Sequence, residues 1–138
     1  MTTLHDHGLL GPDVQLVHAV QATDEELALL AATGTSLSVS PITSLRSMGF
    51  PRITAALAAG VSLSLSTDTL AGPTAADTFA QMKVAYSVAR SLGDQALDQR
   101  QVLRLATIDA AHGLGLADRT GSITPGKRAD IQVIRATD

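Results

Sequence analysis

The sequence predicts an α/β fold made of parallel strand–helix repeats. Three short apolar segments, residues 14–17, 36–40 and 61–66, have the length of buried strands, and turn signals and helical segments follow them. The 138 residues include two Phe, one Tyr and no Trp, so Ala, Leu, Val and Ile must build the core, as they do in layered α/β structures. Short alternating units of strand and helix favour a parallel sheet.

The first helix carries the clearest boundary signals. Thr23 is expected to be its N-cap, and Glu26, three residues later, completes a capping box. Gly34 is expected to end the helix. Three further helices are predicted at residues 51–59, 75–92 and 98–112.

Two predictions concern packing and the tail. In the long helix, Phe79, Met82 and Val88 recur near helical spacing, so this stripe is expected to face the core. Residues 121–134 are rich in turn signals and predict a hairpin that ends in an edge strand.

Composition and charge exclude several classes of function. Ten basic against thirteen acidic residues give a net charge of -3 without any run of like charges, which argues against a nucleic-acid partner. The chain has no Cys, so a bound metal would need His and carboxylate ligands. No run of eighteen apolar residues and no signal-peptide pattern occurs, and we therefore expect a cytoplasmic protein without a membrane segment.

Two reactive side chains, His18 and Asp68, follow predicted strands directly. In parallel strand–helix folds the carboxyl ends of the strands form one rim, where active sites concentrate. An imidazole and a carboxylate that meet there can bind a divalent metal, and such a metal makes water a nucleophile near neutral pH. A lone His and a lone Asp are also compatible with many other sites.

The amino-acid sequence around these two residues is a more specific signal. The passages VHAVQATDEELALLAATGTSLSVSP and GFPRITAALAAGVSLSLSTDTLA, and the ending LATIDAAHGLGLADRTGSITPGKRADIQVI, cover nearly the whole chain. They resemble the C-terminal part of metal-dependent amidohydrolases, in the branch of cytosine deaminase, S-adenosylhomocysteine deaminase and triazine hydrolase. The resemblance implies hydrolysis of carbon–nitrogen bonds other than peptide bonds, on a small-molecule substrate, with zinc or iron.

The resemblance also implies roles for individual residues. His18 matches the His after strand six, which contacts the substrate or polarises the attacked carbon. Asp68 matches the Asp after strand eight, which binds the metal and activates water. Ser40-Pro41 and Thr43-Ser44 match the strand-seven loop, but Val39 and Ser40 stand where relatives often have His and Asn, and this departure puts a substrate contact from that loop in doubt.

The family's remaining metal ligands have no counterpart in the sequence. A His-x-His pair from strand one and a His from strand five would precede residue 1, and a whole (β/α)8 barrel needs roughly 250 residues. We therefore expect a partial TIM barrel, about strands six to eight, in residues 1–117, and a segment returning to a small β domain in 118–138. His5 and His7 offer an alternative metal pair, but they precede strand six, and a position in a loop or at a helix end is the simpler interpretation.

Three interpretations of function remain at this point. The first is an amidohydrolase fragment that is inactive alone and is completed by a chain supplying strands one to five. The second is a non-catalytic module that self-associates through its open strand edges as a homo-oligomer. The third, a small independent α/β binding protein, lacks any ligand fingerprint.

Overall fold

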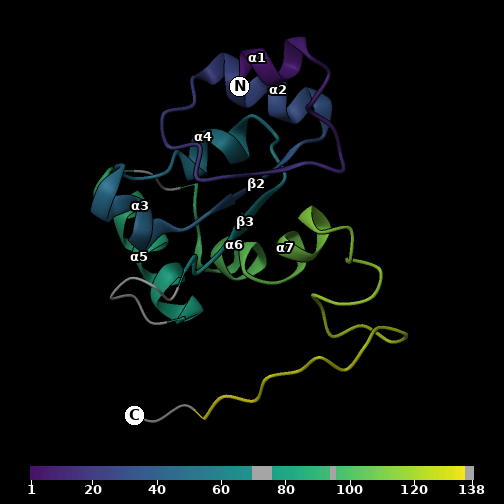
Figure 1. The fold of residues 1–138 in the computed structure, drawn as a ribbon. Helices are drawn as coiled ribbons and strands as arrows, with labels where there is room; N and C mark the ends of the chain where they lie inside the picture. Colours follow the sequence, from purple (N-terminus) through teal and green to yellow (C-terminus); the bar gives the residue numbers. More distant parts are fainter. Residues whose placement is uncertain (70–75, 94–95, 136–138) are drawn as a thin grey trace.

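The computed structural model of the protein describes residues 1–69, 76–93 and 96–135. At its centre lies a parallel sheet of three strands in the order β1-β2-β3 (Figure 1). The strands are β1 (Gln15–Val17), β2 (Ser36–Val39) and β3 (Leu63–Leu65). Leu16 pairs with Leu37, and Ser38 pairs with Ser64. This confirms the predicted parallel sheet, and each strand falls within its predicted segment.

Helix α2 (Asp24–Thr33) connects β1 to β2 and begins and ends as predicted. Thr23 Oγ1 accepts the backbone N–H of Glu26 at 3.2 Å, and Glu26 Oε2 accepts the N–H of Thr23 at the same distance. Gly34 ends the helix with φ of 72°, a left-handed conformation that favours glycine.

Helices α3 (Pro41–Ser47) and α4 (Ile53–Ala58) connect β2 to β3. The sequence predicted α4 but treated Pro41 only as the end of a strand. In the structure Pro41 is the first residue of α3, the one helical position where its missing N–H costs nothing. The chain also begins with a short helix, α1 (Thr2–Asp6), that the sequence did not predict.

Helix α5 (Thr78–Ser91) follows β3 and is capped by Asp77, whose side chain accepts two backbone N–H groups. The predicted start near residue 75 lies outside the described residues. The predicted core stripe is wrong at Phe79, which is 54% exposed. The buried stripe is instead Gln81, Ala85 and Ala89, and Phe79 lies two residues, or about 200° of rotation, from Gln81.

The single helix predicted over residues 98–112 is two helices, α6 (Gln99–Leu105) and α7 (Ile108–Gly113). Thr107 interrupts them with φ of -132° and ψ of -98°, and its hydroxyl donates to the Leu103 carbonyl at 2.7 Å. A β-branched residue that bonds back to the preceding turn disfavours continuation of the helix. The break lets α7 pack against β3 and β2.

The sheet lies between two helical layers, with α1, α2 and α4 on one side and α6 and α7 on the other (Figure 1). Every residue of β2 and β3 is buried, which is expected for a parallel sheet covered on both faces. Helices α3 and α5 pack together beside the carboxyl end of β2. In the part of the chain that is described, no helix has the length and apolar character needed to cross a membrane.

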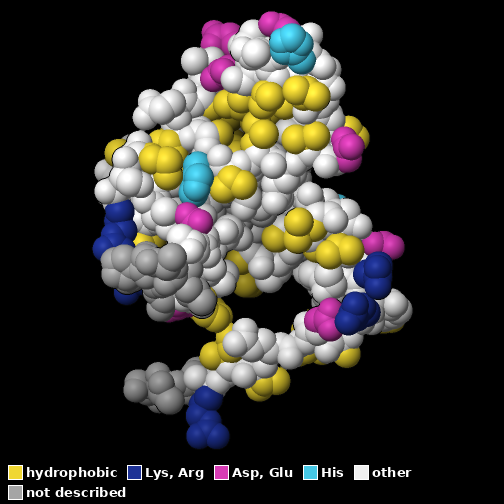
Figure 2. Space-filling model, viewed as in Figure 1, with side chains coloured by type: hydrophobic (Ala, Val, Ile, Leu, Met, Phe, Trp, Pro, Cys, Tyr) yellow, Lys and Arg dark blue, Asp and Glu magenta, His cyan; other side chains and the backbone are white. Residues whose placement is uncertain are grey.

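The tail differs from the predicted hairpin. Over residues 118–135 the structure forms turns and an extended segment but no strand. Ile123 and Val133 are 88% and 91% exposed, and Figure 2 shows the tail standing away from the body. A strand needs a neighbouring strand for its backbone hydrogen bonds, and no such partner lies beside residues 130–134 in the described structure. The division at residues 117 and 118 stays a prediction.

The capping box gives a first testable prediction. Thr23→Ala removes the hydroxyl that accepts the Glu26 N–H, so we expect the free energy of unfolding to fall by about 1 kcal/mol. Thr23→Ser keeps the acceptor and is the matched control. Urea unfolding measures both variants, and equal losses in the two would contradict the capping role.

Candidate active site

His18 and Asp68 lie together, as the sequence predicted. His18 follows β1 and Asp68 follows β3, the two strands that flank β2. His18 Nε2 is 3.6 Å from Asp68 Oδ2, and the two side chains are 27% and 24% exposed. The pair is therefore accessible to a small molecule but sheltered from bulk water on most sides.

Unusual backbone conformations bring the pair together. His18, Ala19 and Asp68, with φ of 67°, 46° and 62°, are the non-glycine residues with positive φ in the described structure. Such conformations are costly for residues with a Cβ and concentrate at functional sites. The Ser38 carbonyl holds the first turn by accepting the His18 N–H at 2.9 Å.

A short hydrogen-bond chain supports Asp68. Its backbone N–H donates to Ser66 Oγ at 3.0 Å, and its Oδ1 accepts the N–H of Thr69 at 2.8 Å. Ser40, which follows β2, donates its hydroxyl to Ser66 Oγ at 3.3 Å. The ends of all three strands therefore contribute to one polar cluster.

The segment that matches the family's strand-seven loop, residues 40–44, directs its serine side chains inward. Ser40 is fully buried and its hydroxyl faces Ser66, while Ser44 is fully buried and its hydroxyl has no hydrogen-bond partner among the described residues. Ser40 therefore supports the turn before Asp68, and the residues of this region that line the cleft are Ser47 and Met48 at the end of α3.

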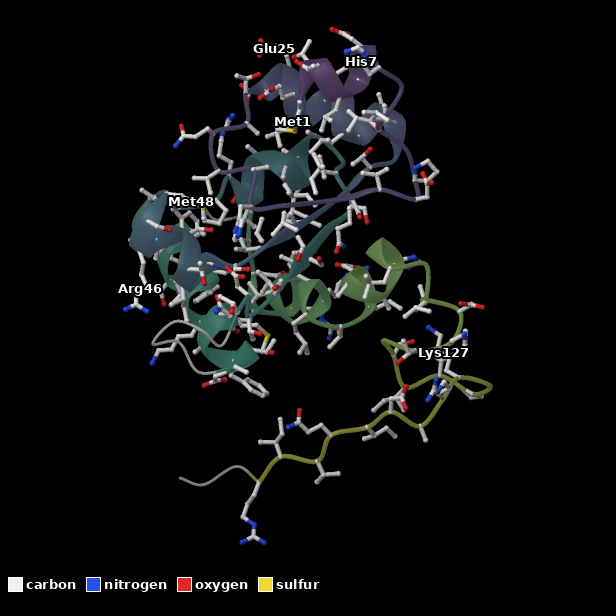
Figure 3. All side chains as sticks on the ribbon, viewed as in Figure 1. Met1, His7, Glu25, Arg46, Met48 and Lys127 are labelled. Carbon is white, nitrogen blue, oxygen red and sulfur yellow. The ribbon has the colours of Figure 1, made fainter. Side chains whose placement is uncertain are left out.

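A cleft of about 480 Å³ opens beside His18. Its wall is formed by residues 18–22, by the end of α3 at Ser47 and Met48, and by Met1 and Glu26. Figure 3 labels Met1 and Met48, which come from distant parts of the chain. Gln21 Nε2 donates to the Met48 carbonyl at 3.4 Å and bridges the two loops. The cleft is mainly apolar with a few polar groups, as small-molecule sites usually are.

One ring nitrogen of His18 has no partner among the described residues. Nε2 faces Asp68, whereas Nδ1 is buried and none of residues 1–69, 76–93 and 96–135 offers it a hydrogen bond. A buried polar atom without a partner is costly, and native structures normally supply a partner. Nδ1 therefore marks a place where a further polar group is expected to bind.

The other histidines lie elsewhere. His5 is on α1, where its ring is 45% exposed and Nδ1 lies 3.5 Å from Asp6 Oδ1, and neither His5 nor His7 lines the cleft beside His18. His112, on α7, borders a second cavity of about 220 Å³ with Asp109 and residues 61–63. That cavity lies at the amino end of β3, opposite the candidate site.

The described residues do not form a complete metal site. Zinc in proteins is held by at least three protein ligands. Across residues 1–69, 76–93 and 96–135 no three His, Asp or Glu side chains converge in a way that could hold a metal ion. His18 and Asp68 are donors of the right kind but too few, so these residues alone do not fit the ion.

Sequence reasoning missed Ser66 as a member of the site. The signal was present, since a Ser placed two residues before an Asp can accept the N–H of that Asp in a local turn. Gln21 was also missed, because its bond to the Met48 carbonyl joins loops that only the fold brings together.

Nearly the whole chain, residues 1–137, matches the model of the amidohydrolase family. The chain belongs to the amidohydrolase family. It is 37% identical over 138 residues to a 5-methylthioadenosine/S-adenosylhomocysteine deaminase of Teredinibacter turnerae, a match covering 98% of this chain and 31% of that protein. The chain thus spans about a third of the length of this curated relative.

Solved structures of family members are similar. A zinc-bound adenosine deaminase from Xanthomonas campestris superimposes with a TM-score of 0.88 and 36% identity, over 94% of this chain and 30% of that one. Triazine hydrolase from Arthrobacter aurescens gives a TM-score of 0.82 and 28% identity, over 93% of this chain and 29% of the other. The predicted family and branch are confirmed, and zinc occurs in at least one such relative.

Asp68 provides a test of the strained backbone. Asn tolerates positive φ and keeps the oxygen that accepts the Thr69 N–H, so Asp68→Asn should leave the free energy of unfolding within about 0.5 kcal/mol. Asp68→Val should lower it by about 1–3 kcal/mol, because a β-branched residue is disfavoured at positive φ. Urea unfolding compares the two, and equal stability of both variants would contradict the strain.

Glu26, on the wall of the cleft, predicts a pH dependence. A hydrogen bond from the Met1 ammonium, 2.7 Å from Oε1, lowers the pKa of Glu26 below its ordinary 4.5, and the N–H of Thr23 adds to this. Because the folded pKa is depressed, the stabilisation is present above pH 4.5 and is lost as the pH falls through the folded value. Glu26→Gln should flatten the stability profile in that acidic window, measured by urea unfolding at several pH values. A profile that keeps its slope would assign the dependence to other groups.

Proposed function

We propose that this chain supplies part of the active site of a deaminase-type amidohydrolase that hydrolyses a carbon–nitrogen bond of a small heterocyclic substrate. The observation that carries the proposal is the His18–Asp68 contact at the carboxyl ends of β1 and β3. The family membership supports it, and so do the adenosine-type compounds in the names of the relatives, which make an adenosine derivative the first substrate to test.

The two side chains would act as a donor and an acceptor. Asp68 Oδ2 is free of the Thr69 contact made by Oδ1, so it would accept a proton from the attacking water. His18 Nε2, 3.6 Å away, would donate to the substrate atom on which negative charge develops. The substrate would enter through the cleft beside His18.

The chain would need groups from outside its own described residues. Asp68 would be this chain's ligand to a zinc or iron ion whose other ligands come from elsewhere, and such an ion would supply the chemistry of water activation. In the part of the chain that the structure describes, each of β1 and β3 has one hydrogen-bonded neighbour, and Val17 on β1 is 54% exposed. We propose that β1 to β3 correspond to strands six to eight of a TIM barrel and that the remaining strands complete the sheet at both edges.

Complementation tests this proposal. The 138-residue chain is purified alone and after co-expression with the preceding two-thirds of the Teredinibacter turnerae relative, and deamination of adenosine and 5-methylthioadenosine is followed by ultraviolet absorbance. We expect activity and bound metal in the combined sample, and neither in the chain alone.

Variants assign that activity to the pair. In the combined sample Asp68→Asn and His18→Asn should each reduce kcat/KM by about 10²–10⁴-fold, the range for loss of a group that transfers a proton. Asp6→Asn, an exposed carboxylate on α1, is the matched control and should leave activity unchanged. Activity that survives Asp68→Asn would overturn the assigned roles, and a stoichiometric metal in a monomer of the chain alone would overturn the need for completion.

A second candidate function is a self-associating, non-catalytic module. The exposed apolar side chains of the extended tail favour it, since they offer a surface for pairing with another copy. These side chains are Ile123, Ile131, Val133 and Ile134. A stable, metal-free homodimer in native mass spectrometry, dispersed by Val133→Lys, would support this candidate over the enzyme.

A further inference from the structure

Helix α3 begins in an unusual way. Ser40 occupies its N-cap position and is among the residue types that most often cap helices, yet its side chain makes no capping hydrogen bond. The hydroxyl is directed away from the helix to Ser66 Oγ. Another group must therefore satisfy the first free N–H of α3.

That group is the side chain of Gln81 on α5. Pro41, the first residue of α3, has no N–H, so the first donor belongs to Ile42. Gln81 Oε1 accepts the Ile42 N–H at 3.0 Å. Because an N–H can only donate, this contact also fixes which end of the Gln81 amide faces α3.

Gln81 is a poor choice for stability alone. Its side chain is fully buried, and within the described part of the chain neither its Nε2 nor the hydroxyl of Ser44 on α3 has a hydrogen-bond partner. A buried amide with one satisfied end carries an uncompensated desolvation cost that an apolar side chain of similar volume would avoid. A role beyond packing would explain the residue.

The consequence of this contact reaches Asp68. Since Gln81 satisfies Ile42, the Ser40 side chain need not turn toward α3 to accept that N–H, and it points instead at Ser66 Oγ, to which its hydroxyl donates. Ser66 Oγ in turn accepts the Asp68 N–H at 3.0 Å. The Ser40 hydroxyl limits the directions in which the Ser66 lone pairs can point. Asp68 meanwhile holds a φ of 62°, a conformation that needs support from its surroundings.

We infer that Gln81 is a positioning residue that caps α3 from α5 and thereby frees Ser40 to hold Ser66 and the strained backbone of Asp68. The catalytic meaning of this arrangement rests on the proposed function of Asp68. The arrangement itself is a property of the fold and can be measured without any enzyme assay.

The test is amide hydrogen exchange by NMR on the 138-residue chain. Gln81→Met keeps the length of the side chain and removes the acceptor, so the Ser40 hydroxyl should turn back to cap α3. We expect about tenfold faster exchange at Asp68, the factor that loss of an ordinary hydrogen bond produces, together with shifted Ser40 and Ser66 resonances. Ala85→Gly, one turn along the buried face of α5, is the matched control for lost helix stability and should leave the Asp68 amide unchanged relative to global unfolding.

Two more variants connect the effect to the hydroxyl. Gln81→Glu keeps an oxygen acceptor at the start of α3 and should restore the parent exchange rate at Asp68. Ser40→Ala should reproduce the Asp68 effect, and Gln81→Met should add nothing further at Asp68 when Ser40 is already Ala.

Several results would overturn the inference. One is an Asp68 amide that stays protected in Gln81→Met, and another is an Asp68 amide that responds equally to Ala85→Gly. If Gln81→Met does not fold, Ser40→Ala decides, because an unchanged Asp68 amide there breaks the link. A positive exchange result combined with no deamination in the complemented sample would retain the positioning role and reject the proposed function.

Discussion

The structure depends on how the chain turns at the carboxyl ends of β1 and β3. These strands are separated by β2, and two strand spacings amount to about 9.5 Å. Side chains that stood perpendicular to the sheet would remain about that far apart, yet His18 Nε2 and Asp68 Oδ2 approach to 3.6 Å. Both residues have left-handed backbone conformations, so the chain changes direction sharply where each of these segments leaves the sheet.

Such a backbone persists only where the surroundings over-determine it. The register of β1 against β2 places the Ser38 carbonyl under the His18 N–H, and the β2–β3 register places Ser40 next to Ser66. The strands themselves are held by apolar side chains on both faces, with Leu37, Val39 and Leu63 nearly inaccessible. The buried sheet is therefore the rigid support on which the strained site is built.

The parts of the fold that follow from local pattern were predictable. The strand ends at His18 and Asp68 were marked by short apolar runs, and α2 by its capping box, because these signals act within a few residues. Pro41 was ambiguous, since the same residue that cannot continue a strand is favoured at the first turn of a helix. The break at Thr107 is accompanied by a hydrogen bond from its hydroxyl to the carbonyl four residues earlier, and the hydrophobic periodicity of the sequence does not reveal such a bond.

The site was only partly predictable for a related reason. Ser66 bonds within its own turn, so the sequence carries a local signal for it. Gln81 contacts α3 only through the packing of α5 on α3, and the sequence does not distinguish it from any other buried helical residue. The predicted edge strand in the tail failed because a strand is defined by its neighbour, and sequence pattern alone does not provide one.

The unsatisfied features of the structure lie in consistent places. Among the described residues His18 Nδ1 is buried without a partner, and β1 and β3 each have one hydrogen-bonded neighbour. In a closed parallel barrel every strand has two neighbours and the rim gathers side chains from several strands. A part of such a barrel would contain two features seen here: two potential metal ligands, His18 and Asp68, at the strand ends, and two strands with one described neighbour each. Under the proposed completion, the same additional strands that paired with the sheet edges would bring further polar groups to the strand ends beside His18, so one change would complete both the sheet and the site.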